Sequence, residues 1–338
     1  MIMPLVYLVG GFILLIKGAD WLVEGSSSIA RRVGLSDLMI GLTVVSFGTS
    51  APELIVNIIA SFQGSADIAI GNIVGSNISN TLLILGITAM ITPLVVQRST
   101  ILKEIPFVLL ASVTLLIMAN DIIVDGAAQS VLSRSDGMAF LGFFIIFLYY
   151  TFGIRRHSVL EEGPSKVKMP LGKAWMLFLV GLVCLGIGGN LAVEGAKAIA
   201  SLLGLSEALI GLTVVALGTS LPELAASVVA ARKGKTDIAI GNIVGSNIFN
   251  IFWILGISAT IKPLPFQPAL NLDLLVVVGS TLLLFFLIHN GKLHHRLLLW
   301  WKQEKDYILN KVEGGILFTG YIVYICYIVY RDLFIVVG

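Results

Sequence analysis

One stretch of the chain occurs twice, 170 positions apart. Residues 41–80, which begin GLTVVSFGTSAPELIVN, and residues 211–250, which begin GLTVVALGTSLPELAAS, match at 26 of 40 positions without a gap. Two copies of one ancestral unit imply two halves that fold alike, which constrains the fold more than any local pattern. Each copy also carries a glutamate, Glu53 or Glu223, within an otherwise apolar run.

The composition is that of a membrane protein. Hydrophobic residues make up 57% of the 338 residues and charged residues only 12%, with a mean hydropathy of +0.97. Soluble domains carry about 25% charged residues, and apolar runs of about 20 residues are long enough to cross a bilayer. The net charge of +2 and the absence of a basic stripe argue against a nucleic-acid partner. The two cysteines lie inside apolar runs and suggest neither a disulfide nor a metal site.

Hydropathy predicts ten membrane spans. They lie near residues 4–30, 38–62, 68–92, 103–120, 137–153, 172–202, 207–231, 238–262, 271–289 and 313–331. We therefore expect an all-α polytopic membrane protein. Its domains are a first five-helix repeat at 1–153, a cytoplasmic connecting loop at 154–171 and a second repeat at 172–338.

Five spans per repeat is an odd number, so the second copy must enter the membrane inverted relative to the first, as in many secondary transporters. The basic residues support this topology. The loops on one side hold seventeen Lys and Arg residues, the opposite side has only Arg134, Lys262 and Arg331, and two lysines lie within spans. By the positive-inside rule the basic side is cytoplasmic. We expect a multi-pass protein of the cell membrane with both termini extracytoplasmic.

The repeated phrase Gly48-Thr49-Ser50-Ala51-Pro52-Glu53 predicts a broken helix inside a span. Pro52 has no backbone N–H, so the carbonyl of Gly48 loses its helical partner. Broken helices at membrane depth are tolerated where they line a polar cavity. Two hydroxyls and a carboxylate beside the break give a cluster of hard oxygen atoms.

Such oxygens suit Ca²⁺, which takes roughly six to eight oxygen ligands, and Na⁺, which is of nearly equal radius. One phrase offers too few ligands, whereas two inverted copies that meet at the midplane offer enough. We therefore interpret each copy as half of one ion site.

A second repeated phrase, DIAIGNIVGSNISN at 67–80, recurs at 237–250 with one change. At helical spacing, Asn72, Ser76 and Asn80 form one polar stripe, which can reach the surroundings of Glu53. Gly71 and Gly75 form a face of small residues beside it, where a neighbouring helix could approach closely.

Some of the charged residues have structural interpretations. Asp67 and Asp237, at the predicted helix starts, are interpreted as N-caps. The intramembrane glutamates could instead pair with Lys17 or Lys197. A charge at the bilayer centre, however, usually marks a transport pathway.

The two phrases resemble the alpha-repeat motifs of the calcium/cation antiporter superfamily, in particular its prokaryotic sodium/calcium exchangers. The resemblance covers nearly the whole chain and implies two inverted five-helix repeats with discontinuous helices at the midplane. It also implies a ligand set with Glu53 and Glu223 as central carboxylates. The matching positions are Thr49, Ser50, Thr219, Ser220, Ser76, Ser246, Asn80 and Asn250, with backbone carbonyls at Ser46 and Ala216.

The resemblance further implies that the first and sixth helices slide against the remaining bundle to give alternating access. Several relatives carry Asp where this chain has Asn250, so the site charge here is that of two glutamates. This charge of −2 balances one Ca²⁺ or two Na⁺, so a three-for-one exchange would be electrogenic. Asn250 also argues against K⁺ dependence. Beyond the transported Na⁺ and Ca²⁺ no cofactor is expected, and no obligate protein partner is evident.

Three other functions compete with this interpretation. Two neighbouring carboxylates repel each other and favour protonation, which is compatible with H⁺/Ca²⁺ exchange. An intramembrane lipid phosphatase would need Arg or Lys beside its nucleophile, and neither repeated phrase contains one. Broken helices also line channels. The hydroxyl-rich phrases favour a Na⁺/Ca²⁺ antiporter that extrudes Ca²⁺, and not an enzyme.

Overall fold

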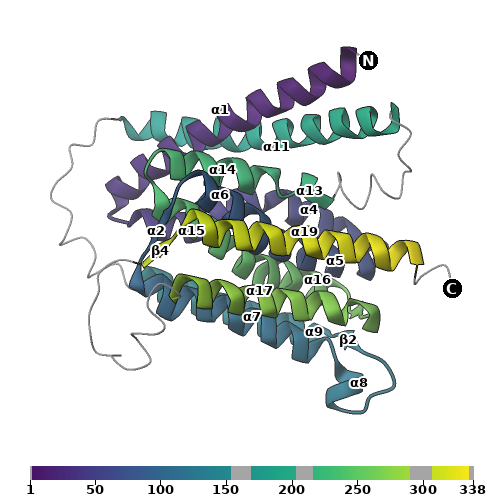
Figure 1. The fold of residues 1–338 in the computed structure, drawn as a ribbon. Coiled ribbons are helices and arrows are strands. Elements are labelled where there is room, and N and C mark those ends of the chain that lie inside the picture. Colours follow the sequence, from purple (N-terminus) through teal and green to yellow (C-terminus); the bar gives the residue numbers. More distant parts are fainter. Residues whose placement is uncertain (1, 154–168, 203–215, 290–306, 335–338) are drawn as a thin grey trace.

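The computed structural model describes residues 2–153, 169–202, 216–289 and 307–334, and these are almost entirely helical (Figure 1). In the first half the helical elements are α1 (Ile2–Val33), α2 (Asp37–Ile40), η1 (Gly41–Val45), α3 (Ser46–Thr49), α4 (Ala51–Gln63), α5 (Ala66–Ile78), η2 (Ser79–Ile84), α6 (Leu85–Ile91), η3 (Thr100–Glu104), α7 (Ile105–Met118), α8 (Asp121–Val124) and α9 (Arg134–Gly153). In the second half they are α11 (Leu171–Leu202), α13 (Ala216–Gly218), α14 (Leu221–Arg232), α15 (Thr236–Ile248), η5 (Phe249–Leu255), α16 (Gly256–Ile261), η6 (Pro268–Leu270), α17 (Asn271–His289) and α19 (Lys311–Phe334).

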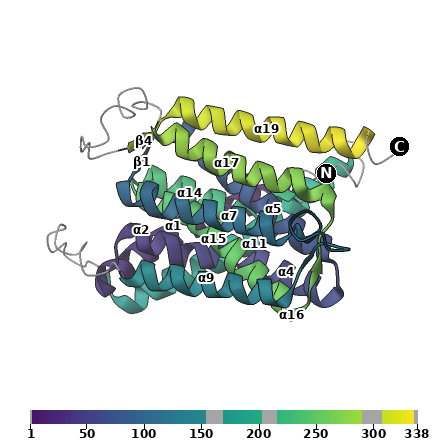
Figure 2. The ribbon, with the colours of Figure 1, turned by 90° about the horizontal axis from the view of Figure 1, so that it is seen from below.

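The helices agree with the predicted spans. Among the described residues, eight helices are long and apolar enough to cross a membrane, and a pair bent by 48° between Thr49 and Ala51 makes a ninth. The predicted span at 207–231 is described only from Ala216 onward, as α13 and α14. The long helices lie side by side, roughly along one common axis, as both views show (Figures 1 and 2). The first residues of α1 and the last of α19 lie at the same end of this bundle (Figure 1).

Two small antiparallel sheets display the inverted symmetry. Strand β1 (Leu94–Val96) pairs with β4 (Tyr307–Leu309), and β2 (Val131–Leu132) pairs with β3 (Leu264–Pro265). Each sheet joins a loop of one half to a loop of the other. Strands β4 and β2 lie at opposite ends of the bundle (Figure 1). Since β1 and β3 are separated by the repeat distance, equivalent loops face opposite sides of the membrane.

The aspartates predicted as N-caps have another role. The residues that precede the helices are Ser65 for α5 and Lys235 for α15, and Asp67 and Asp237 lie within the first turn. Gln267 Nε2 donates to Asp67 Oδ2 at 2.7 Å, and Gln97 Nε2 donates to Asp237 Oδ2 at 2.6 Å. The N-cap prediction was therefore wrong: each aspartate binds a glutamine of the opposite half.

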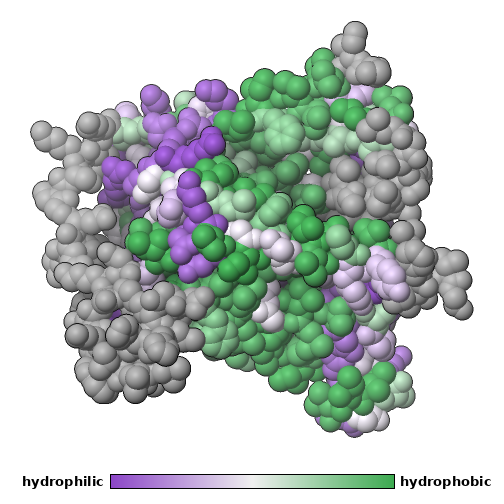
Figure 3. Space-filling model, viewed as in Figure 1, coloured by the Kyte–Doolittle hydropathy of each residue, from purple (hydrophilic) through white to green (hydrophobic). Residues whose placement is uncertain are grey.

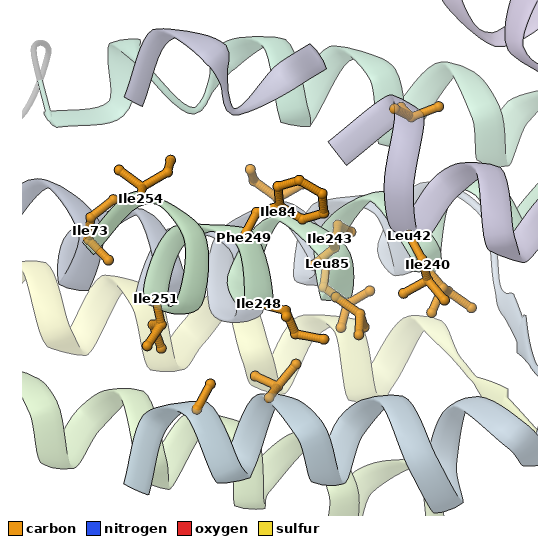
Figure 4. Close-up of a cluster of buried hydrophobic side chains, with 14 of the residues drawn as sticks. Leu42, Ile73, Ile84, Leu85, Ile240, Ile243, Ile248, Phe249, Ile251 and Ile254 are labelled. Carbon is orange, nitrogen blue, oxygen red and sulfur yellow. The ribbon is translucent and has the colours of Figure 1, made fainter. Parts of the chain in front are cut away.

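The two helices that contain the second repeated phrase form the centre of the bundle. In the helices at 66–91 and 236–261 the most apolar 18-residue stretches are 78% and 94% buried, whereas the other six unbroken helices reach at most 44%. Apolar side chains from these segments and from η1 pack together in the interior (Figure 4). On the face seen in Figure 3, hydrophobic residues cover the middle of the bundle, and hydrophilic residues gather toward its left end and at the lower right. This pattern fits a bundle surrounded by lipid.

Helices α1 and α11 pack along each other with their backbones in contact. Each contributes three glycines at seven-residue spacing, and the two sets are related by the repeat: Gly11, Gly18 and Gly25 with Gly181, Gly188 and Gly195. A Cβ added at Gly188 would lie 2.8 Å from the backbone nitrogen of Leu15, and one added at Gly25 would lie 2.6 Å from the carbonyl oxygen of Ala174. No other residue type could occupy these positions without pushing the helices apart.

At Gly71 and Gly75 no described atom lies within 4 Å of an added Cβ, whereas a close approach is seen at their counterparts in the second half. A Cβ added at Gly241 would lie 2.8 Å from the carbonyl oxygen of Leu38, and one at Gly245 would lie 2.7 Å from that of Leu42. The segment equivalent to Leu38 and Leu42 in the second half, around 208–212, lies outside the described residues. The close approach predicted at Gly71 and Gly75 themselves therefore stays a prediction.

Candidate functional site

The two glutamates occupy equivalent places just after the helix breaks. Ser50 separates α3 from α4, Ser220 precedes α14, and a proline stands in the first turn after each break. Glu53 and Glu223 follow in those first turns, where the positive end of the helix dipole stabilises a carboxylate. Each side chain is only 1% exposed.

Side chains of opposite halves meet at these carboxylates. Ser50 Oγ lies 3.2 Å from Glu223 Oε1 and 3.0 Å from Ser246 Oγ. Ser76 Oγ donates to Glu53 Oε1 at 3.5 Å. Glu223 is thus contacted by a hydroxyl from the break of the other half, and Glu53 by a hydroxyl of the central helix of its own half.

No ion pair to either glutamate is found within the described residues, where Lys197 binds Glu194 on its own helix at 3.1 Å. The alternative in which Lys197 neutralises a site glutamate therefore finds no support in this geometry.

Several buried oxygens of the two repeated motifs lack a hydrogen-bond partner. Within the described part of the chain, such atoms on the predicted site residues are Glu53 Oε2, Glu223 Oε2, Asn80 Oδ1, Asn250 Oδ1 and Ser220 Oγ. Buried polar atoms in proteins are nearly always paired, so five unpaired oxygens on the equivalent motifs of two repeats require a partner. A hard cation satisfies several such oxygens at once.

The donor set has few carboxylates and many neutral oxygens. Among the residues that the structure describes, no three His, Cys, Asp or Glu side chains lie together so that they could hold a metal ion. The site therefore suits Na⁺ or Ca²⁺, which bind hydroxyl, amide and carbonyl oxygens, better than zinc or another transition metal.

Some predicted residues serve to hold the site in place. The hydroxyl of Ser46 lies 2.6 Å from the carbonyl oxygen of Gly41 and 3.1 Å from that of Asn242, and thereby fastens the broken span to α15. Its own carbonyl accepts the backbone N–H of Ser50 at 2.9 Å and faces the hydroxyl of Thr49 at 3.4 Å. Thr49 Oγ1 donates to Asn242 Oδ1 at 3.0 Å. Ala216 begins α13, two residues before Gly218.

The polar stripe divides between two tasks. Ser76 and Asn80 contribute to the site, but Asn72 Nδ2 donates to Asn57 Oδ1 at 2.7 Å, which joins α5 to α4. On the other side Asn242 Nδ2 donates to Ser227 Oγ at 3.0 Å, which joins α15 to α14 in the equivalent way. These contacts fix each broken span against its central helix.

Two asparagines outside the predicted ligand set lie between the halves. Asn80 Nδ2 donates to Asn247 Oδ1 at 3.1 Å, and Asn250 Nδ2 donates to Asn77 Oδ1 at 3.0 Å. The signal was present in the sequence, because Asn77 and Asn247 occupy the same place in the two copies of GSN, three residues before Asn80 and Asn250.

Two inverted helical repeats with paired broken spans and a buried, oxygen-rich centre define a class: secondary transporters of hard cations. Comparison with known proteins identifies the family. The sequence profile described as "Sodium/calcium exchanger protein" matches residues 3–153 and 173–330, so the chain belongs to the sodium/calcium exchanger family. It is a membrane transporter of the calcium/cation antiporter superfamily and not an enzyme.

Individual relatives agree along most of their length. The chain is 42% identical to the "Putative antiporter CaxA" of Alkalimonas amylolytica over 270 residues, or 78% of this chain and 82% of the relative. It is 32% identical to the "Sodium/calcium exchanger MaX1" of Methanosarcina acetivorans over 313 residues, or 80% and 89%. The solved structure of the sodium-calcium exchanger NCX_Mj soaked with 2.5 mM Na⁺ and 0.1 mM Ca²⁺ shares the fold, with a TM-score of 0.76, 33% identity and coverage of 96% and 98%. The predicted ten-helix inverted-repeat fold is thereby confirmed.

Proposed function

We propose that this antiporter exchanges Na⁺ for Ca²⁺ across the cell membrane by alternating access, and that it uses the sodium gradient to extrude Ca²⁺. The single observation that carries the proposal is the contact of Ser50 with Glu223 and Ser246, which joins the two repeated motifs around one buried site. Each half contributes one carboxylate, hydroxyls and an asparagine oxygen. Together these groups supply the number and type of ligands that Ca²⁺ requires.

The charge of the proposed site sets what it can carry. Two ionised glutamates balance one Ca²⁺ or two Na⁺, so the same oxygens can hold either ion in turn. A third Na⁺ would leave one uncompensated positive charge, and an exchange of three Na⁺ for one Ca²⁺ would then move charge across the membrane. In this proposal the ligands are Glu53, Glu223, Ser50, Ser220, Thr49, Thr219, Ser76, Ser246, Asn80, Asn250 and the carbonyls of Ser46 and Ala216.

For alternating access we propose that α1 and α11 move as one unit against the other helices. Their continuous backbone contact supports this, because two helices packed so closely cannot slide past each other without breaking the contact. The proposed orientation places the basic loops in the cytoplasm and both termini outside, on the basis of the Lys and Arg distribution.

Flux in everted membrane vesicles tests the proposal. An imposed outward Na⁺ gradient should drive Ca²⁺ uptake, and Glu53→Gln or Glu223→Gln should abolish it. Glu104→Gln is the matched control. Glu104 is also buried, but it lies just before α7, outside the repeated motifs, and accepts a hydrogen bond from Tyr150. Na⁺-driven uptake by either site variant at the wild-type rate would refute the assignment.

The same vesicles separate Na⁺ from H⁺ as the coupling ion. Ca²⁺ flux is compared under a Na⁺ gradient at constant pH and under a pH gradient without Na⁺. The hydroxyl-rich site favours Na⁺, because a proton needs only the carboxylates and none of the surrounding oxygens. Uptake driven by the pH gradient alone would instead assign H⁺/Ca²⁺ exchange.

A further inference from the structure

The side-chain amide of Asn250 has one bound end and one free end. Its Nδ2 donates to Asn77 Oδ1 at 3.0 Å, while its Oδ1 is buried and lacks a partner in the described part of the chain. The two ends of an amide are chemically opposite: the oxygen can bind a cation and the NH₂ group cannot. The direction of this amide therefore decides whether Asn250 is a ligand or an obstacle.

That direction is set by Asn77 and, through it, by a backbone carbonyl. Asn77 Nδ2 donates to the main-chain oxygen of Asn247 at 3.4 Å. A carbonyl oxygen only accepts hydrogen bonds, so Asn77 must turn its NH₂ group toward it and its Oδ1 toward Asn250. The oxygen of Asn77 then requires a donor, and among the described residues the NH₂ end of Asn250 supplies it. Asn250 is left with its oxygen free for the site.

The equivalent hydrogen bonds of Asn80 end at a side-chain hydroxyl and not at a backbone carbonyl. Asn80 Nδ2 donates to Asn247 Oδ1 at 3.1 Å, and Asn247 Nδ2 donates to Thr81 Oγ1 at 2.9 Å. A hydroxyl can donate as well as accept, so the amides of Asn80 and Asn247 can both turn round without losing a hydrogen bond. The position equivalent to Thr81 is Ile251, which leaves Asn77 with the carbonyl in place of a hydroxyl. The two asparagine ligands are thus held in different ways.

We propose that Asn77 is a positioning residue, which fixes the amide of Asn250 so that its oxygen faces the transported cation. The inference rests on the proposed function, since it assumes that the site between the repeats binds Na⁺ and Ca²⁺. Asn77 itself touches no ion. It acts by excluding the amide orientation that would direct two N–H groups at a positive charge.

A double-mutant cycle tests this role, because a carboxylate at position 250 has two equivalent oxygens and no wrong orientation. Ca²⁺ binding to the purified full-length protein is measured by calorimetry for the wild type, Asn77→Ala, Asn250→Asp and the double variant. Loss of one such hydrogen bond is worth about a fivefold weakening of Ca²⁺ binding in Asn77→Ala. In the Asn250→Asp background the same substitution should change the dissociation constant by less than about twofold.

Asn72→Ala is the matched control. It removes an asparagine one turn away on the same helix, whose bond to Asn57 does not lead to position 250. It should have the same effect in both backgrounds, as any purely structural loss would. The proposal is overturned if Asn77→Ala binds Ca²⁺ as tightly as the wild type, or weakens binding equally in both backgrounds. If the wild-type chain bound neither Ca²⁺ nor Na⁺, the proposed function would be wrong and the positioning role would fall with it.

Discussion

The hydroxyl of Ser50 lies 3.2 Å from a carboxylate oxygen of Glu223, a residue 173 positions later in the chain. The first belongs to the helix break of one repeat and the second to the helix that comes after the break of the other. This contact crosses the boundary between the halves at the repeated motif that contains Glu53 and Glu223. It makes the proposed ion site a property of both halves together.

Removal of the Ser50 hydroxyl should weaken Ca²⁺ binding without unfolding the protein. A hydrogen bond to a charged group contributes about 1.5–3 kcal/mol, so Ser50→Ala is expected to raise the half-saturating Ca²⁺ concentration about tenfold or more. The measurement is Na⁺-driven ⁴⁵Ca²⁺ uptake over a range of Ca²⁺ concentrations. Ser61→Ala is the control, because Ser61 is buried on the same helix but donates only to the carbonyl of Asn57. An equal effect of the two substitutions would contradict a special role of Ser50.

The glycines between α1 and α11 should tolerate no side chain. Gly188→Ala would place a methyl group 2.8 Å from the backbone nitrogen of Leu15, and overpacking of this kind costs about 1–3 kcal/mol. We expect a lower midpoint of thermal unfolding in detergent and slower exchange. Gly186→Ala on the same helix is the control, since no described atom lies within 4 Å of its added Cβ. If Gly188→Ala unfolded at the temperature of Gly186→Ala, the backbone contact would not be required.

An ion pair connects α1 to the turn after α14. Lys233 Nζ lies 2.6 Å from Asp20 Oδ1 and also donates to the main-chain oxygen of Asp20 at 3.2 Å. If α1 moves during transport, this pair favours the state in which it forms. Lys233 is one of the basic loop residues, so the pair holds α1 against that side of the protein. Asp20→Asn should then favour opening there and raise the apparent Ca²⁺ affinity on the side of the basic loops, and the exposure of the pair limits the change to a few-fold.

Charge reversal provides the check. Lys233→Asp combined with Asp20→Lys should restore the affinity seen in everted vesicles, whereas either reversal alone should not. Lys197→Gln is the control, because its partner Glu194 lies on the same helix and the pair joins nothing else. A shift of the same size in Lys197→Gln would show that loss of surface charge alone is responsible.

Repetition and helical period account for the part of the site that could be predicted from the sequence. Glu53 and Glu223 could be assigned to one site because inverted copies must meet, and Ser76 with Asn80 could be added from their four-residue spacing. The role of Asn72 was not predictable in this way. It shares the stripe with Ser76, yet it binds Asn57, because the direction of a polar side chain depends on which helix packs beside it.

Contacts between distant segments account for the other differences. Asp67 and Asp237 look like N-caps in a local reading, and only the folded loops bring Gln267 and Gln97 to them. Likewise the glycines at seven-residue spacing in α1 acquire meaning only once α11 is known to lie against them. Local propensity gives the element, and tertiary packing gives each polar side chain its partner.

The charge of the site predicts how exchange responds to membrane potential. With two glutamates and two asparagines, a site that carries one Ca²⁺ inward for three Na⁺ outward moves one net positive charge out. Proteoliposomes are loaded with Na⁺, and external K⁺ is set about tenfold above internal K⁺. With valinomycin present the interior becomes positive by about 60 mV, which is worth about 1.4 kcal/mol per charge and should raise the final Ca²⁺ accumulation about tenfold.

Without valinomycin, replacement of external K⁺ by choline should change nothing, because Asn250 supplies no third carboxylate to hold K⁺. Stimulation by K⁺ without the ionophore would show that K⁺ is transported, and no effect of the ionophore would mean that only two Na⁺ exchange for each Ca²⁺.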